Sequence, residues 1–315
     1  MKPSFSFGDA IEAPLVLIRR RPFAVFVWGL LMIAVVAAIY AMLLPILINL
    51  PWEQADAAME AYIGEMIQVQ LVSNALTIVM YLVMLVVFTA AGRATLDADR
   101  GDRFLFLRLG MDEVRVAVVV VACFVGWYVA LLLLILIGVG LGLALYAAGQ
   151  ATMVITLLIY GLVVFVASLI GWARISLIAP ATLILGRFAF AEGWTIAKGQ
   201  VLKLLGLNVL IWLIYMICYI ALALVVAAIL IGGFFAQGLT WPQNVQHPQD
   251  LMPIVQPMLI PLAATVPVFA FGYGAYMALV SAPFVRAARQ LLDGAPVVRP
   301  DIGQDAAPED TLQTP

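Results

Sequence analysis

The sequence predicts an all-α polytopic membrane protein with six transmembrane helices and cytoplasmic interfacial amphipathic helices. Composition, the length of the apolar runs and the placement of basic residues predict this fold class. Hydrophobic residues make up 65% of the 315 residues and charged residues 11%, against roughly 45–50% and about 25% in globular domains. This composition argues against a soluble fold, and a net charge of -2 offers no basic surface for nucleic acid.

Six apolar runs are long enough to cross a hydrocarbon core about 30 Å thick, which takes roughly 20 helical residues. They span residues 23–50, 66–92, 114–149, 151–172, 205–233 and 255–285. We expect helices here, because every backbone amide in lipid needs a hydrogen-bond partner within the protein. Gly110 followed by Asp112 indicates a stop and then the N-cap of the third span.

The basic residues are confined to alternate connections of this six-span arrangement. All 16 lysines and arginines lie in the amino-terminal segment, the second-to-third connection, the fourth-to-fifth connection and the tail. Residues 51–65 and 234–254 contain none. Because loops rich in lysine and arginine stay cytoplasmic, we expect both termini in the cytoplasm. An excess of arginine over lysine is typical of GC-rich bacterial genomes, so we predict a multi-pass protein of the bacterial inner membrane.

Three regions follow from this arrangement. Residues 1–22 form a cytoplasmic segment with an amphipathic helix, and residues 23–290 form the six-helix transmembrane domain. Residues 291–315 are rich in aspartate, proline and alanine, a composition typical of a disordered cytoplasmic tail.

Two segments next to the spans have the spacing of amphipathic helices. In residues 187–207, an apolar stripe at helical spacing consists of Phe190, Trp194, Ala197, Val201 and Leu204. Near the amino terminus, the matching stripe consists of Phe7, Ile11, Leu15 and Ile18. We expect both segments to lie on the membrane surface, with Phe7, Ile11, Phe190 and Trp194 as interfacial anchors. The similarity favours an internal repeat, in which each unit consists of a surface helix followed by a hairpin of two spans. The alternative is that the two segments are ordinary interfacial helices that set the depth of the spans in the membrane.

Residues 173–207, ARISLIAPATLILGRFAFAEGWTIAKGQVLKLLGL, contain Arg174 near the inner end of a span, Pro180, a short amphipathic helix and a Lys-Gly-polar step at Lys198. This run resembles the membrane domain that accompanies some bacterial glycerophosphodiester phosphodiesterases, and related stand-alone six-span families of unknown function. Gly193 stands where serine is common in that pattern, and Leu202 where an aromatic residue is common. The resemblance implies a fold and a location rather than an activity.

The sequence lacks a constellation typical of catalysis. His247 is the only histidine, which excludes multi-histidine metal sites. The carboxylates lie in loops or in the tail, and no serine has a partner base. We therefore expect no catalytic residues, no metal and no cofactor, and we predict that the protein is not an enzyme.

Polar residues on the second span leave a transport function open. Gln70, Asn74 and Thr77 share one helical face, where they either bond a neighbouring helix or line a polar path. The leading hypothesis is a lipid-associated scaffold or accessory component of the envelope; the alternative is a carrier of small solutes or lipids. A carrier requires a continuous polar cavity that reaches Asn74, whereas a scaffold requires a closed core.

Arg174 is the strongest candidate for a lipid contact. It ends a span, yet another apolar run follows before the next charge at Arg187. Its guanidinium therefore needs an acceptor, either a lipid phosphate or a carbonyl near Pro180; the alternative is an arginine that marks the membrane boundary. Arg187, Lys198 and Lys203 complete the candidate phosphate contacts. The expected partners are anionic lipid headgroups, with other membrane proteins or a second copy of the chain as further possibilities.

The charge distribution predicts a topology that reporter fusions can measure. Fusions after Gly64 and Gln246 should report the outside, and fusions after Arg100, Lys198 and Gln304 the cytoplasm, because the basic residues sort that way. One inverted loop would contradict the six-span arrangement.

Overall fold

The computed structural model describes residues 4–48, 59–96, 104–107, 110–146, 149–240 and 252–294, and within them it contains helices and no strand. The helices are α1 (Phe7–Arg20), α2 (Pro22–Ile48), α3 (Met59–Leu96), the short 3-10 helix η1 (Phe104–Phe106), α4 (Met111–Leu145), α5 (Gln150–Ile175), α6 (Ile178–Leu185), α7 (Phe190–Ile196), α8 (Val201–Ala236) and α9 (Met252–Asp293). The predicted all-α fold is confirmed.

Six stretches of helix are long and apolar enough to cross a membrane, and each overlaps one of the predicted runs. Several are longer than a bilayer requires. The 42 residues of α9, at 1.5 Å each, extend about 63 Å, roughly twice the thickness of the hydrocarbon core. The spans therefore continue beyond the lipid as helices.

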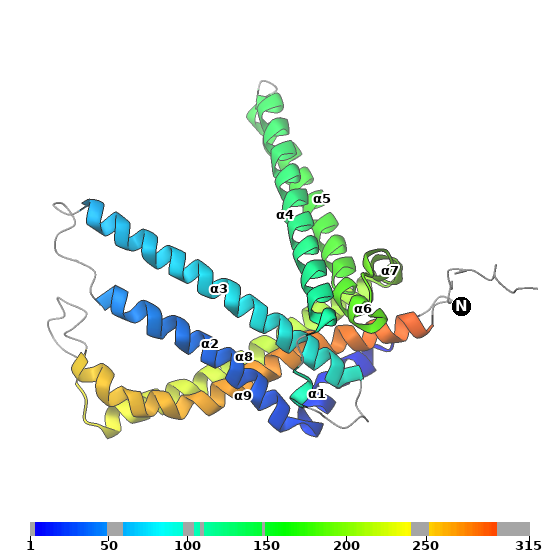
Figure 1. The fold of residues 1–315 in the computed structure, drawn as a ribbon. Coiled ribbons are helices and arrows are strands. Elements are labelled where there is room, and N and C mark those ends of the chain that lie inside the picture. The colour runs from blue at the N-terminus through cyan, green and yellow to red at the C-terminus, as the bar shows by residue number, and fades with distance from the viewer. Residues whose placement is uncertain are drawn as a thin grey trace, which may run out of the picture.

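Helix α9 is the element around which the others pack: α1, α2, α3, α6 and α8 all contact it (Figure 1). It runs antiparallel to α2 at a very short distance. A Cβ atom on Gly274 would lie 1.8 Å from the carbonyl oxygen of Val25, and one on Gly29 would lie 1.6 Å from that of Ala270. Only glycine permits this approach, because any side chain would overlap the facing backbone.

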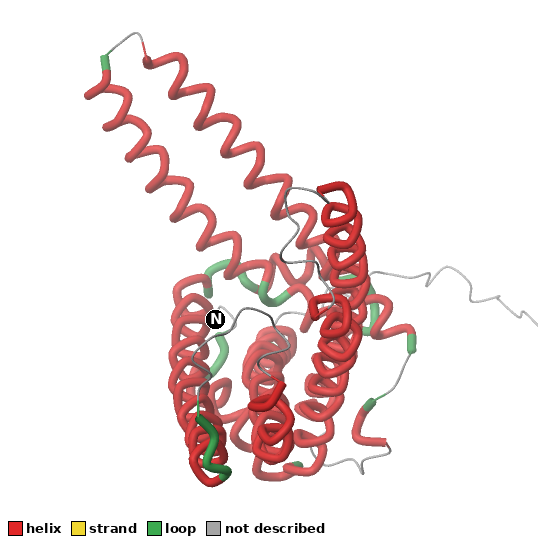
Figure 2. The backbone as a smooth tube through the Cα atoms, turned by 90° about the vertical axis from the view of Figure 1, so that its left-hand side faces the viewer, coloured by secondary structure: helices red, strands yellow, loops and turns green. Residues whose placement is uncertain are grey.

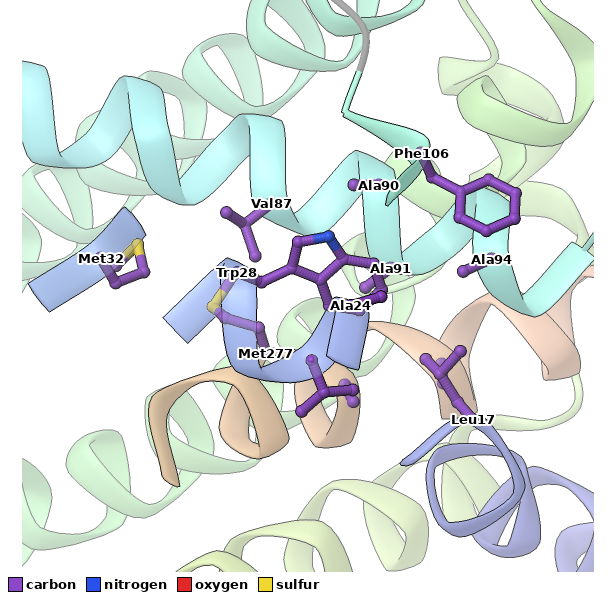
Figure 3. Packing of buried hydrophobic residues seen from close by; sticks show 13 residues of the cluster. Leu17, Ala24, Trp28, Met32, Val87, Ala90, Ala91, Ala94, Phe106 and Met277 are labelled. Carbon is purple, nitrogen blue, oxygen red and sulfur yellow. The ribbon is translucent and has the colours of Figure 1, made fainter. Parts of the chain in front are cut away.

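A buried cluster beside this crossing centres on Trp28 of α2 (Figure 3). The indole packs among side chains of α3 and α9, including Val87, Ala91 and Met277. Its Nε1 donates a hydrogen bond of 3.0 Å to the carbonyl oxygen of Leu105. The core thus joins three spans to the connection that follows α3.

Helices α4 and α5 form a hairpin that extends away from α2, α3, α8 and α9 (Figures 1 and 2). Along its length, Gly138 lies against Tyr160 and Gly171 lies against Trp127. The hydroxyl of Tyr160 donates a hydrogen bond to the carbonyl oxygen of Leu134. Most of the remaining apolar side chains of the hairpin are exposed, as expected for surfaces that face lipid.

The prediction of one interfacial helix within residues 187–207 is wrong. Helix α7 ends at Ile196, a turn follows, and α8 begins at Val201. The turn contains Gly199 at φ +88°, a left-handed conformation that ends a helix. Ala197 and Leu204 are buried in a protein cluster with residues of α9 rather than directed at lipid.

Helix α1 forms as predicted, with Ser6 as its N-cap. Its buried face, however, consists of Ala10, Pro14 and Leu17 rather than the predicted stripe, and Leu15 is 48% exposed. The difference arises because α1 packs along α9. Since α1 has 14 residues and α7 has 7, the two segments are not equivalent elements.

The α2–α9 crossing generates a stability prediction. Gly274→Ala should lower the free energy of unfolding by about 1–3 kcal/mol, because the new methyl group overlaps the backbone at Val25. Gly126→Ala on α4 is the matched control: its Cβ meets nothing within 4 Å, so helix propensity should make it neutral or slightly stabilising. Circular dichroism during SDS titration of detergent-solubilised protein measures both. Equal stability of the two variants would contradict the close crossing.

Candidate functional site

The described lysines and arginines lie at one end of the molecule, which we call the charged end. This end comprises α1, the first residues of α2, α4 and α8 and the last residues of α3, α5 and α9. Contacts between distant segments join it. Arg289 Nη1 donates to the carbonyl oxygen of Leu96 at 3.0 Å, and Gln290 Nε2 donates to Asp9 Oδ2 at 3.0 Å. The described basic residues of separate connections therefore lie together in space.

A buried ion pair joins α3 to α4 at the charged end. The side chain of Glu113 is 5% exposed and that of Arg93 is 15% exposed, and Arg93 Nη2 donates to Glu113 Oε1. Thr89 Oγ1 donates to the same oxygen at 3.3 Å, and the amide of Gly110 donates to Glu113 Oε2 at 2.9 Å. Both oxygens of this carboxylate accept hydrogen bonds from the protein. Glu113 therefore has a structural role, in which it holds α3 and α4 together.

Sequence reasoning missed this pair. Glu113 stands one residue before the predicted third span, and nothing in its neighbourhood indicated that α3 would place an arginine beside it. The expected N-cap, Asp112, instead lies in the first turn of α4, where it pairs with Arg115 at 3.1 Å. Gly110 occupies the cap position, and the Glu113 side chain bonds its amide.

Arg174 lies in the last turn of α5, and its guanidinium stands over the ring of Trp194 in α7, 5.0 Å from the centroid. The Nε of Arg174 is buried and has no hydrogen-bond partner within the described part of the chain. The carbonyl expected near Pro180 therefore does not accept from this nitrogen. Trp194 is 41% exposed, so this contact forms at the surface.

The other candidate phosphate contacts have different surroundings. Arg187 Nη2 pairs with Glu192 Oε1 at 2.9 Å. Lys203 Nζ lies over the ring of Phe5, 5.9 Å from its centroid, and Lys198 is exposed in the turn before α8. The four predicted residues thus share the charged end without converging on one point.

The predicted interfacial anchors differ in their exposure. Phe190 and Trp194 are exposed on α7. Phe7 and Ile11 are half-buried and pack against the cluster that contains Leu204 and other residues of α8 and α9. Part of the apolar surface of α1 is therefore covered by protein.

The polar face of the second span lies on the outside of α3. Gln70 Nε2 donates to Asn74 Oδ1 at 2.9 Å, and both side chains are exposed. Thr77 Oγ1 donates to the carbonyl oxygen of Ser73 at 2.7 Å. These polar side chains thus form their hydrogen bonds within α3 itself.

Among the described residues, no group of three or more histidine, cysteine, aspartate or glutamate side chains could hold a metal ion. His247 lies outside the described residues.

The chain matches no protein-family model, no curated protein and no solved structure.

The buried pair generates a second stability prediction. Glu113→Gln should cost about 3 kcal/mol, because it removes the nearer and more buried counter-charge of Arg93 and leaves only the partly exposed Asp112, 3.7 Å away. Asp112→Asn is the comparison variant: Asp112 also lies 3.7 Å from Arg93, but it is 43% exposed, and exposed ion pairs contribute about 0–1 kcal/mol. The double variant Arg93→Met, Glu113→Leu removes both charges and should recover most of the stability that Glu113→Gln loses. The interpretation fails if Glu113→Gln is no more destabilising than Asp112→Asn in an SDS titration.

Proposed function

We propose that this integral membrane protein is a non-enzymatic, lipid-associated scaffold or accessory component of the bacterial inner membrane, and that Arg174 binds the phosphate of an anionic lipid. One observation carries the proposal: the Arg174 guanidinium is held over Trp194 while its buried Nε lacks an acceptor. Six apolar spans support the membrane location.

The energetics favour an acceptor from outside the protein. A buried N–H group without a partner costs about 1–3 kcal/mol, and a cation–π contact at a partly exposed site returns only about 0.5–1 kcal/mol. No carboxylate in the described part of the chain forms an ion pair with Arg174. A phosphate would supply the negative charge and would accept from the terminal nitrogens of the guanidinium.

The position of Arg174 suits a lipid ligand. The part of α5 that precedes Arg174 contains no charged residue, so the guanidinium lies at the boundary between the apolar span and the charged end. Phe190 and Trp194 present exposed aromatic surface beside it, and aromatic rings favour headgroup depth. Lys198 and Lys203 add positive charge at the same end. Arg187 contributes less, because Glu192 already neutralises it.

The alternative function, a carrier of small solutes or lipids, has weaker support. A carrier needs polar groups that line a path between helices, whereas Gln70 and Asn74 are exposed on α3 and bond each other. A scaffold role agrees better with the close packing of α9 against its neighbours.

A relationship to the membrane domain that accompanies glycerophosphodiester phosphodiesterases is also a proposal. The resembling run forms the end of α5, α6, α7 and the start of α8, which is the segment that carries Arg174. Its departure at Gly193 has a packing reason: a Cβ atom there would lie 2.6 Å from the Cα of Ile178, so serine would force α6 and α7 apart.

The phosphate proposal predicts that Arg174→Lys inserts normally but retains less anionic lipid. Lysine keeps the charge and loses the planar fork that stacks on Trp194 and bonds two oxygens. Arg187→Lys is the matched control, because it makes the same change at an exposed, ion-paired position. Phosphatidylglycerol retained through purification in mild detergent, measured by mass spectrometry, should fall about fivefold to tenfold for Arg174→Lys only. Equal retention in both variants would leave Arg174 with a boundary role alone.

A further inference from the structure

A cavity of about 330 Å³ lies at the charged end between α1, the end of α3 and the last part of α9. Its volume falls within the lower part of the range of ligand pockets, about 300–1,000 Å³. It is lined by one face of α1, by Ala94 and Thr95 of α3 and by Arg286 of α9. None of the residues at the Arg174 site lines it, so it is a separate feature of the molecule.

The walls of the cavity carry charges of both signs. Asp9 and Glu12 line it from the first half of α1, whereas Arg20 and Arg21 line it from the other end of that helix and Arg286 from α9. At 1.5 Å per residue, Glu12 and Arg20 are about 12 Å apart along the helix axis. One small headgroup therefore cannot reach both Glu12 and Arg20. Arg286 lies nearer to the carboxylates, because Gln290, one turn further along α9, bonds Asp9.

Two of these charged side chains are accessible to a ligand. Glu12 and Arg286 line the same cavity, both are exposed, and neither forms a hydrogen bond or ion pair within the described residues. Asp9 accepts from Gln290 through only one of its oxygens. A carboxylate of α1 and a guanidinium of α9 are thus both accessible to a ligand in this cavity.

This arrangement selects against simple ions. An anion alone at Arg286 would be repelled by the nearby Asp9 and Glu12, and a cation alone at these carboxylates would be repelled by Arg286. A ligand that carries an ammonium group and a phosphate a few bonds apart avoids both repulsions. Its ammonium would donate to the carboxylates, and its phosphate would accept from guanidinium groups in two-point fashion.

Apolar side chains beside the cavity indicate that this ligand has acyl chains. Val16 lines the cavity and is 40% exposed, and its neighbour Leu15 is also exposed. Exposed aliphatic side chains next to a charged pocket suit a lipid whose headgroup enters the pocket while its chains stay outside.

We propose that the cavity between α1, α3 and α9 binds the headgroup of a zwitterionic aminophospholipid, with the ammonium at Glu12 and Asp9 and the phosphate at Arg286. The site is independent of the anionic-lipid contact at Arg174. It makes α1 a lipid-binding element as well as a packing element.

The test uses the full-length protein in mild detergent, with lipid binding measured by native mass spectrometry. Phosphatidylethanolamine should bind about tenfold more tightly than phosphatidylcholine, whose methylated ammonium has no N–H donor, and than phosphatidylglycerol at this site. Glu12→Gln and Arg286→Gln should each remove about tenfold of the phosphatidylethanolamine affinity. Arg19→Gln, at an exposed position of α1 outside the cavity lining, should leave it unchanged.

The outcomes separate the two proposals. Loss of phosphatidylethanolamine binding in Glu12→Gln with normal phosphatidylglycerol retention supports this cavity whatever Arg174→Lys does. Unchanged phosphatidylethanolamine affinity in both Glu12→Gln and Arg286→Gln would overturn the proposal. Displacement of the lipid by an equal concentration of soluble phosphoethanolamine would overturn the role of the acyl chains and leave a free aminophosphate as the occupant.

Discussion

The close crossing of α2 and α9 is the constraint on which the remaining structure depends. Gly29 and Gly274 bring two backbones together without intervening side chains, and this fixes the position of α2 along α9. Trp28 is then placed against α3 and can bond Leu105 in the following connection. In a membrane, where lipid competes equally for apolar side chains, such dense backbone packing is a main source of specific association.

The same helix α9 also builds the charged end. Because it is much longer than a bilayer requires, its last part extends beyond the lipid and carries α1 along its side. Gln290 bonds α1 at Asp9, and Arg289 bonds the end of α3 at Leu96. One helix thus organises both the membrane-spanning packing and the polar surface where the candidate sites lie.

The charged groups at this end are of two kinds: those that have partners in the described protein and those that have none. Glu113 is buried with donors from Arg93, Thr89 and Gly110, so it holds α3 and α4 together. Arg174 is stacked on Trp194 with a buried nitrogen that lacks an acceptor, and Glu12 and Arg286 face a cavity without partners in the described structure. At the boundary of the apolar spans, lipid headgroups can supply counter-charges to groups that have no partner in the described protein.

The sequence by itself determined the six spans and the end at which charge collects, because hydropathy and basic residues add up along the chain independently of which helices become neighbours. Tertiary structure alone decided the rest. Gly29 and Gly274 carry the tightest contact while Gly140 faces open space, although the three look alike in sequence. Glu113 became a buried partner only when α3 placed Arg93 beside it, and Arg174 met Trp194 only when the turn at Gly186, which ends α6, folded α7 back. These outcomes depend on the angles and distances between helices, and local sequence periodicity contains no information about either.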